Sequence, residues 1–140
     1  MTLVIDASVA LKWLLGDKSR EPDLVIARQT LLAIVTGGHP LVQPPHWIAE
    51  VVGVMARRDP DHVAEAIEAL GALDFRTVAT DACYLRAAKL AHRYQQHVFD
   101  TLYHAVALEH EAVFVTADDR YFAAVRGEGR IERLQTFRLA

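Results

Sequence analysis

The chain has 140 residues and a mass of 15.6 kDa, which fits one domain spanning residues 1–140. Apolar residues make up 52% of it and charged residues 24%, a composition that supports a buried core and excludes a disordered protein. The net charge of −3 is uneven, because residues 1–119 are acidic whereas residues 120–140 contain five arginines and two glutamates. An acidic body with a basic tail is compatible with a polyanion held near an acidic site, although an ordinary mixed surface gives the same balance.

The cysteine content and the apolar runs restrict the class of protein further. Cys83 is the only cysteine, so neither an internal disulfide nor a cysteine-rich metal knuckle is possible. The apolar stretch 24–35 is interrupted by polar residues and is shorter than the about 20 residues of a membrane span. The chain opens on Thr-Leu-Val-Ile without a basic segment and a long apolar run, so no secretory signal is expected. These features predict a cytoplasmic protein with no membrane partner.

Short apolar runs alternate with helical patterns along the whole chain. In order, the patterns predict a strand at 3–5, a helix at 9–15, a polar link at 16–22, a helix at 24–35, a strand at 41–43, helices from 44–45 to about 58 and at 61–73, a strand at 75–78, helices at 81–95 and about 100–110, a strand at 112–115, a short helix at 121–125 and a last strand near 134–137. Strands that are short and separated by amphipathic helices favour parallel pairing with helices on both faces. The expected fold is a three-layer α/β domain with a short, mostly parallel sheet.

Acidic residues follow two of the predicted strands and lie on two of the predicted helices. Asp6 and Asp118 come directly after the strands 3–5 and 112–115, where the functional cleft of a parallel sheet lies. Asp100 begins one helix, and Glu50 lies one to two turns into another. If the two strands are neighbours, these four carboxylates converge on one cleft.

Each of these acids also has a purely structural interpretation. Asp6 or Asp100 could cap a helix, although Ser8 competes with Asp6 for the first cap, and Asp118 could form a simple turn. Glu50 lies among apolar residues and therefore needs a charged or hydrogen-bonding partner. Taken singly, the structural interpretations are favoured, whereas the set of four favours a site.

Clustered carboxylates repel one another and are tolerated when they are protonated or matched by a cation. Mg²⁺ prefers oxygen ligands and keeps several waters, and Mn²⁺ is its close substitute. Such ions promote in-line attack of water on a phosphodiester. The acids therefore predict metal-dependent phosphodiester hydrolysis.

Four segments resemble the motifs of PIN-domain ribonucleases, in particular the VapC-type toxins of bacterial toxin–antitoxin pairs. These segments are 4–13 (Val-Ile-Asp-Ala-Ser-Val-Ala-Leu-Lys-Trp), 44–51 (Pro-Pro-His-Trp-Ile-Ala-Glu-Val), 99–107 (Phe-Asp-Thr-Leu-Tyr-His-Ala-Val-Ala) and 115–118 (Val-Thr-Ala-Asp). Each motif alone is weak, but their order and spacing agree over essentially the whole chain. One position departs from the pattern, because Gly53 stands where the family often has Asn.

The resemblance implies a fold, an activity and a set of site residues. It implies a PIN domain whose catalytic and metal-binding residues are Asp6, Glu50, Asp100 and Asp118, with Ser8 and Thr116 as polar support. It further implies an endoribonuclease that uses Mg²⁺ or Mn²⁺, acts as a toxin that arrests growth by cleaving RNA, forms a homodimer and is blocked by a cognate antitoxin. The alternative is a catalytically weakened PIN-like module that binds RNA or a partner without cutting.

Several further residues lie close to these motifs. Asp119 is interpreted as a cap of the short helix, and His104 as a core or surface histidine more readily than a substrate contact. We predict that four arginines after the fourth acid contact RNA phosphates: Arg120, Arg126, Arg130 and Arg133. The helices at 24–35 and 47–55 carry more apolar residues than one buried face requires, which supports the expected homodimer.

Overall fold

A computed structural model describes residues 1–19 and 23–139, and its elements follow the sequence patterns closely. The strands are β1 (Leu3–Ile5), β2 (Leu41–Gln43), β3 (Phe75–Thr77), β4 (Val113–Thr116) and β5 (Ile131–Arg133). The helices are α1 (Ala7–Ser19), α2 (Leu24–Thr36), α3 (Trp47–Arg58), α4 (Val63–Gly71), α5 (Asp81–Tyr94), α6 (Val98–Glu109) and α7 (Asp119–Val125). Short 3₁₀ turns occupy Pro60–His62, Arg126–Glu128 and Leu134–Thr136.

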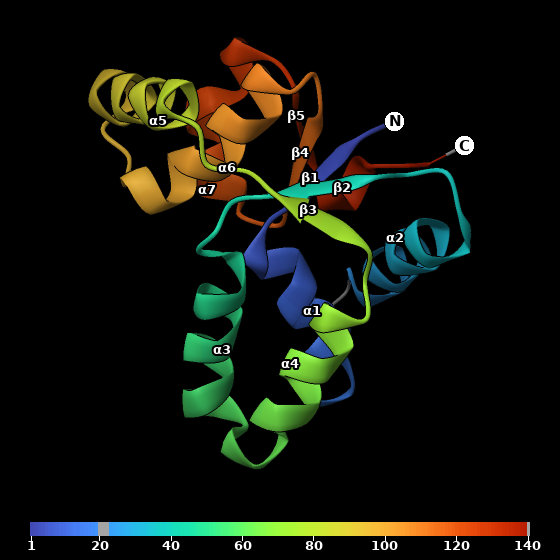
Figure 1. Cartoon of the computed structure of the whole chain (residues 1–140). Helices are drawn as coiled ribbons and strands as arrows, with labels where there is room; N and C mark the ends of the chain where they lie inside the picture. Colours follow the sequence, from blue (N-terminus) through green and yellow to red (C-terminus); the bar gives the residue numbers. More distant parts are fainter. Residues whose placement is uncertain (20–22, 140) are drawn as a thin grey trace.

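The five strands form one parallel sheet in the order β3-β2-β1-β4-β5 (Figure 1). β1 is central and pairs with β4 through Leu3↔Val113, Val4↔Phe114 and Ile5↔Val115. The chain builds the sheet to one side of β1 with β2 and β3, and to the other side with β4 and β5. The strand order therefore switches between β1 and β4, where a parallel α/β sheet opens a crevice at the carboxyl ends of its strands.

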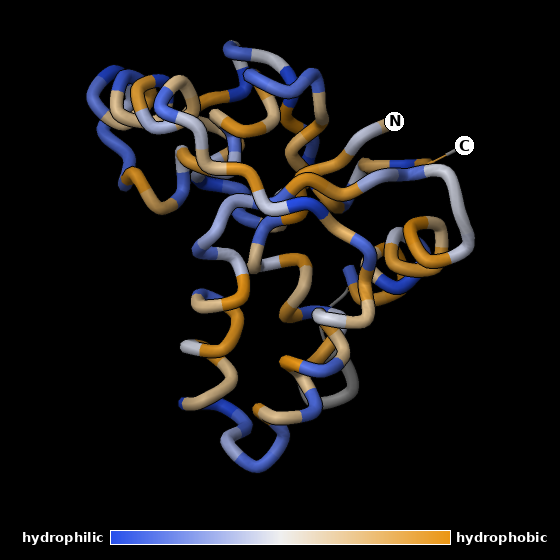
Figure 2. Tube along the Cα trace, viewed as in Figure 1, coloured by the Kyte–Doolittle hydropathy of each residue, from blue (hydrophilic) through white to orange (hydrophobic). Residues whose placement is uncertain are grey.

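Helices cover both faces of the sheet, because alternate strand residues point to opposite sides. Val4, Val42 and Phe114 belong to a core cluster with Tyr103 and Val106 of α6. Leu3, Ile5, Leu41 and Val115 belong to a second cluster with Ala27 of α2 and with Leu134 and Phe137 near the C-terminus. Figure 2 shows the apolar strands at the centre of the molecule. The predicted three-layer α/β arrangement is confirmed.

The outer helices complete the molecule around this sheet. α3 and α4 pack together and extend away from the sheet (Figure 1). α2 ends at Thr36 and is followed by Gly37, whose φ of 134° is a backbone conformation that favours glycine, as the Gly37-Gly38 pair predicts. None of the helices in the described ranges combines the length and apolar character that crossing a bilayer requires.

The start of the first helix differs from its prediction. α1 begins at Ala7 rather than after Ser8, because the Asp6 carbonyl already accepts hydrogen bonds from the amides of Val9 and Ala10 at 3.0 and 3.2 Å. The predicted Ser8 cap is therefore wrong. Residues 16–19 of the predicted link belong to α1, and residues 20–22 lie outside the described residues.

The last strand is also displaced from its predicted position near 134–137. β5 consists of Ile131–Arg133, of which Ile131 alone is apolar, so its pattern gives a weak strand signal. It is defined by pairing with β4, through Phe114↔Ile131 and Thr116↔Arg133. Leu134 of the last 3₁₀ turn and Phe137 directly after it belong to the second core cluster, which explains the apolar pattern that predicted a strand there.

Candidate active site

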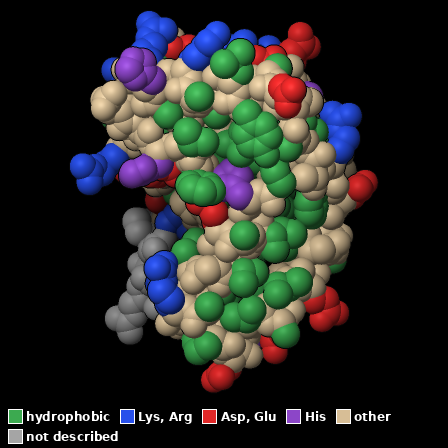
Figure 3. Space-filling model, turned by 60° about the vertical axis from the view of Figure 1, so that its left-hand side comes forward, with side chains coloured by type: hydrophobic (Ala, Val, Ile, Leu, Met, Phe, Trp, Pro, Cys, Tyr) green, Lys and Arg blue, Asp and Glu red, His purple; other side chains and the backbone are tan. Residues whose placement is uncertain are grey.

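A pocket of about 410 Å³ opens at the carboxyl ends of β1 and β4, beside α1 and α3. It is lined by Asp6, Ala7, Ser8, Leu11, Glu50, Gly53, Val54, Arg57, Asp100 and Asp118. The fold thus brings the four predicted carboxylates to one pocket from four separate parts of the chain. Figure 3 shows acidic side chains recessed near the middle of one face, with histidine and hydrophobic side chains around them.

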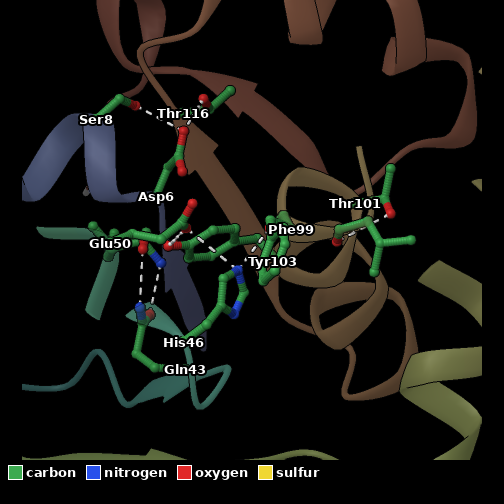
Figure 4. Close-up of polar contacts among 11 residues, drawn as sticks. Asp6, Ser8, Gln43, His46, Glu50, Phe99, Thr101, Tyr103 and Thr116 are labelled. Carbon is green, nitrogen blue, oxygen red and sulfur yellow. Dashed lines mark hydrogen bonds and ion pairs between the residues drawn. The ribbon is translucent and has the colours of Figure 1, made fainter. Parts of the chain in front are cut away.

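Asp6 is the most firmly held of these acids. Its Oδ2 accepts hydrogen bonds from Ser8 Oγ and Thr116 Oγ1, both at 2.7 Å (Figure 4). The two hydroxyls are fixed in turn, because Ser8 Oγ accepts the amide of Ala117 at 3.1 Å and Thr116 Oγ1 accepts the amide of Asp118 at 3.0 Å. Ser8 and Thr116 therefore tie the carboxylate after β1 to the segment after β4.

Burial and neighbouring charges perturb two of the carboxyl groups. Burial raises the pKa of Asp6 from 3.8 to about 6, and the charges of Asp100 and Glu50 add to that rise. The hydrogen bonds from Thr116 and Ser8 favour the charged form and offset part of it. The pKa of Asp100 is also raised, first by burial and then by the charge of Asp118. The carboxylates of the pocket therefore repel one another electrostatically.

Glu50 has the partners that its apolar helix requires. Its Oε1 accepts a hydrogen bond from the Tyr103 hydroxyl at 2.5 Å and lies 3.3 Å from Nε2 of His46. The same His46 nitrogen donates to the carbonyl of Phe99 at 2.6 Å (Figure 4). Since Phe99 precedes Asp100, this network links the first turn of α3 to the first turn of α6. Burial raises the pKa of Tyr103, with the charges of Asp6 and Glu50 adding to it.

The two consecutive acids after β4 make different contacts, and those of Asp119 differ from the predicted ones. Asp118 is the cap of α7, because its Oδ1 accepts the amide of Tyr121 at 3.0 Å while the residue also lines the pocket. Asp119 instead pairs with Arg133 at 3.0 Å on the surface. The interpretation of Asp119 as the cap is therefore wrong, since α7 begins at Asp119, two residues before the predicted start. Asp100 is likewise not a cap, because α6 begins at Val98.

Gln43 holds the backbone beside Asp6 and was not singled out by the sequence patterns. The backbone of β1 pairs with that of β2 at Leu3 and Leu41, and Gln43 lies two residues further along β2. Its buried side chain accepts the amide of Ile5 at 2.7 Å and donates to the carbonyl of Ile5 at 2.9 Å (Figure 4). A polar residue at the end of an otherwise apolar strand is the signal that marks it.

His104 lies in the core, in agreement with its interpretation as a core or surface histidine. The side chain is fully buried, and Nε2 donates to the carbonyl of Gly129 at 2.8 Å while Nδ1 lies 3.3 Å from the Tyr121 hydroxyl. Burial lowers the pKa of His104, so the neutral form is favoured.

None of the four predicted RNA-binding arginines is among the described residues that line the pocket. Arg120 lies in the first turn of α7 and Arg133 ends β5, so both lie at the edge of the sheet that carries the acids. Arg126 and Arg130 follow α7 and precede β5, which places them toward the opposite edge. Their contact with RNA stays a prediction. The pocket is instead lined by Arg57 of α3, which the sequence patterns did not single out.

The donor atoms in the pocket suit a hard cation. They are carboxylate and hydroxyl oxygens, the ligands that Mg²⁺ and Mn²⁺ prefer. Within the described ranges, no three side chains of the His, Cys, Asp and Glu types already stand as a closed ligand set. The chemistry of the donors therefore fits a divalent ion.

The structure is similar to several solved structures of toxin or toxin–antitoxin proteins. The structure is similar to a toxin–antitoxin complex from Klebsiella pneumoniae, with a TM-score of 0.69 and 16% identity over 94% of this chain and 97% of that one. It is similar to VapBC-1 from nontypeable Haemophilus influenzae, with a TM-score of 0.66 and 17% identity over 97% of this chain and 100% of that one. It is also similar to Mycobacterium tuberculosis VapC20, a sarcin–ricin loop cleaving toxin, with a TM-score of 0.65 and 14% identity over 88% and 96% of the two chains.

These structural neighbours share the fold at low sequence identity, so membership of a family rests on the sequence match. No curated protein sequence matches the chain significantly. The sequence model of the PIN domain, however, matches residues 3–128, which include all four carboxylates of the pocket. The chain therefore belongs to the PIN-domain family.

Proposed function

We propose that the protein is a metal-dependent endoribonuclease that acts as the toxin of a toxin–antitoxin pair. The observation that carries this proposal is the gathering of Asp6, Glu50, Asp100 and Asp118 around one pocket at the switch point of a parallel sheet. Membership of the PIN-domain family supports a nuclease, and the toxin–antitoxin proteins among the structural neighbours support the toxin role.

The four carboxylates would hold the divalent ion, Mg²⁺ with Mn²⁺ as a substitute. When bound, that ion supplies Lewis-acid activation of water and neutralises charge that develops on the phosphate. Thr116 and Ser8 fix one oxygen of Asp6 and leave the other oxygen available to the pocket. The Tyr103 hydroxyl and His46 orient Glu50 in the same way. The chain thus holds two of its acids in position before substrate arrives.

The partners proposed for this site are RNA, a cognate antitoxin and a second copy of the chain. An antitoxin segment would block the pocket by bringing a cation, preferably Arg, to the carboxylates, because its planar guanidinium pairs two carboxylate oxygens at once. The dimer is supported by exposed apolar residues on α2, namely Val25, Leu32 and Val35, each more than 60% exposed. The apolar residues of α3 do not support it, because Trp47, Val51 and Met55 are buried in the core.

Cleavage of RNA by the purified protein tests the proposed activity. Cleavage should require Mg²⁺ or Mn²⁺, should not require zinc, and should stop when EDTA is added. It should also be lost in Asp6→Asn. Sequencing of RNA 5′ ends after inducible expression of the wild type and of Asp6→Asn should reveal new ends in the wild type alone. Activity that survives EDTA contradicts the proposal. RNA binding without cleavage favours a catalytically weakened binding module, for which the Gly53 departure is the supporting feature.

A further inference from the structure

The pocket changes character along α3, from acidic to apolar to basic. Glu50 lies at the acidic end, Gly53 and Val54 follow one turn later, and Arg57 follows one turn after those. Spacings of three, four and seven residues place these positions on one face of a helix. A rise of 1.5 Å per residue separates the backbones of Glu50 and Arg57 by about 10 Å along the helix axis. Leu11 of α1 completes the apolar part of the wall.

Arg57 is the positively charged side chain among the described residues that line the pocket. It is exposed, and across the described ranges it has neither an ion-pair nor a hydrogen-bond partner from its side chain. Other arginines are paired, for example Arg86 with Glu109 and Arg133 with Asp119. An unpaired guanidinium beside an acidic pocket is available to an incoming anion, and its planar fork matches a phosphate.

Gly53 leaves the middle of this wall open. A Cβ built at Gly53 meets no atom within 4 Å, so the absent side chain corresponds to free space in the pocket rather than to a close helix contact. The residue thus costs helix stability without serving the packing of α3. Its position between Glu50 and Arg57 makes it a passage between the acidic and basic ends.

We propose that Arg57 binds a backbone phosphate of the substrate strand one or two nucleotides away from the bond that is cleaved, and that the nucleotide between passes over Gly53. This inference rests on the proposed function, because it takes the acidic end as the position of the reacting phosphate. An RNA strand brings several negative charges to a pocket that is already acidic. Arg57 neutralises one of them at a fixed distance from the carboxylates and so sets the register of the strand.

The salt dependence of RNA binding tests the inference directly. The affinity of a short fluorescent single-stranded RNA is measured in EDTA at salt concentrations from about 50 to 200 mM, where each lost phosphate contact shallows the logarithmic slope by about 0.7. For Arg57→Ala, the ratio of its Kd to that of the wild type should shrink about 2.6-fold over that range. Arg57→Lys should keep the slope of the wild type because it keeps the charge. Arg58→Ala is the matched control, since Arg58 is an adjacent exposed arginine that does not line the pocket.

Cleavage kinetics and a modified RNA locate the contact. With Mn²⁺, Arg57→Ala should lower kcat/KM mainly through KM, whereas Arg58→Ala should match the wild type. In a set of RNAs, each carries one uncharged methylphosphonate at a different position. At the phosphate that Arg57 contacts, the methylphosphonate should weaken binding to the wild type but add little to the loss caused by Arg57→Ala. Gly53→Gln should raise KM as well, because a long side chain fills the passage.

The outcomes separate this inference from the proposed activity. If the wild type cleaves RNA but Arg57→Ala keeps both its slope and its KM, the inference is wrong and the activity stands. If no cleavage occurs but the slope depends on Arg57, the phosphate contact stands and the proposed activity is wrong. Absence of salt-dependent RNA binding by the wild type overturns the inference. If Arg57→Ala binds RNA like the wild type but no longer binds the antitoxin protein, Arg57 contacts the protein partner instead, and the inference is wrong.

Discussion

At the scale of single residues, Asp6 is subject to opposing forces. Hydrogen bonds from Ser8 and Thr116 favour its charged form, whereas burial and the neighbouring acids oppose it and raise its pKa to about 6. The chain therefore retains a strained carboxylate where a neutral side chain would fold more readily. Such conflicts are typical of functional sites, where the local cost is offset when a ligand binds.

Replacing Asp6 with Asn should stabilise the metal-free protein. The Asn oxygen can still accept the hydrogen bonds of Ser8 and Thr116, while the charge that raises the pKa of Asp6 is removed. A pKa raised from 3.8 to about 6 corresponds to a penalty of roughly 3 kcal/mol at most. Thermal melts in EDTA should give a higher Tm for Asp6→Asn than for the wild type, and a smaller gain on adding Mg²⁺ or Mn²⁺. A lower Tm in EDTA would show that the carboxylate has a structural role.

The same pair of proteins should show a defined pH dependence. The folded state binds the Asp6 proton more tightly than the unfolded chain does, so ionisation of Asp6 weakens the metal-free fold as the pH rises through its folded pKa of about 6. The penalty is fully present near pH 7–8 and is relieved toward about pH 4, close to the unfolded pKa. The Tm difference between Asp6→Asn and the wild type in EDTA should therefore shrink between about pH 7.5 and pH 4.5. A difference that stays constant over this range contradicts the assignment to Asp6.

At the scale of the elements, Gln43 substitutes for the strand ladder between β1 and β2. Its side chain satisfies both backbone groups of Ile5 at the last residue of β1, immediately before Asp6. The backbone of Gln43 meanwhile pairs with β3 at Thr77. One residue thereby fixes the end of β1 and so the direction in which Asp6 leaves the sheet.

Gln43→Leu should be strongly destabilising, although it preserves most of the side-chain volume. It leaves the buried amide and carbonyl of Ile5 without partners, at a cost of about 2–4 kcal/mol in the free energy of unfolding. Gln43→Glu keeps an acceptor for the Ile5 amide but removes the NH₂ group that donates to the Ile5 carbonyl, so it distinguishes the two hydrogen bonds. Urea denaturation measures both variants, and a loss below about 1 kcal/mol for Gln43→Leu would contradict the bridging role.

A substitution in the middle of α3 should raise the stability of the protein. Gly53→Ala should stabilise the protein by about 0.5–1 kcal/mol, because Ala is the better helix former and its Cβ meets no neighbour. Gly71→Ala in α4 is a matched control, since its Cβ is equally unobstructed and it lies outside the pocket. Melts should show a gain in both variants, whereas only Gly53→Ala should reduce RNA cleavage. Equal cleavage by both variants would show that the Gly53 gap is not part of the substrate path.

At the scale of the whole molecule, exposed apolar side chains lie on several helices. Val25, Leu32 and Val35 lie on α2, and others are Ile67 of α4, Leu85 of α5 and Phe99 of α6. Figure 3 shows hydrophobic side chains running down one face of the molecule. Apolar patches of this kind usually mark interfaces in soluble proteins.

Light scattering should show a dimer at micromolar concentration. Leu32→Asp should weaken it if α2 forms the contact, as the apolar excess of that helix predicts. Leu85→Asp is the matched variant on α5, and both positions are about 60% exposed, so neither substitution should disturb the fold. Dissociation by Leu85→Asp alone would transfer the interface to α5, and a monomeric wild type would contradict the homodimer.

The amino-acid sequence by itself determined the strand and helix order, the parallel α/β class and the four acids that line the pocket. These features depend on local periodicity and on where a polar residue follows an apolar run, so they are visible one segment at a time. β1 and β4 are recognisable as strands for this reason, and parallel neighbours necessarily present Asp6 and Asp118 at the same edge.

The tertiary structure alone decided further contacts that hold and complete that pocket. Gln43 and Ile5 are 38 positions apart, and Tyr103 and Glu50 are 53 apart. The sheet and helix packing bring each pair together, and no local pattern encodes such a contact. The position of β5 was set in the same way, by pairing with β4 that overrides a weak local signal. Arg57 likewise acquires its place in the pocket only because α3 packs beside α1.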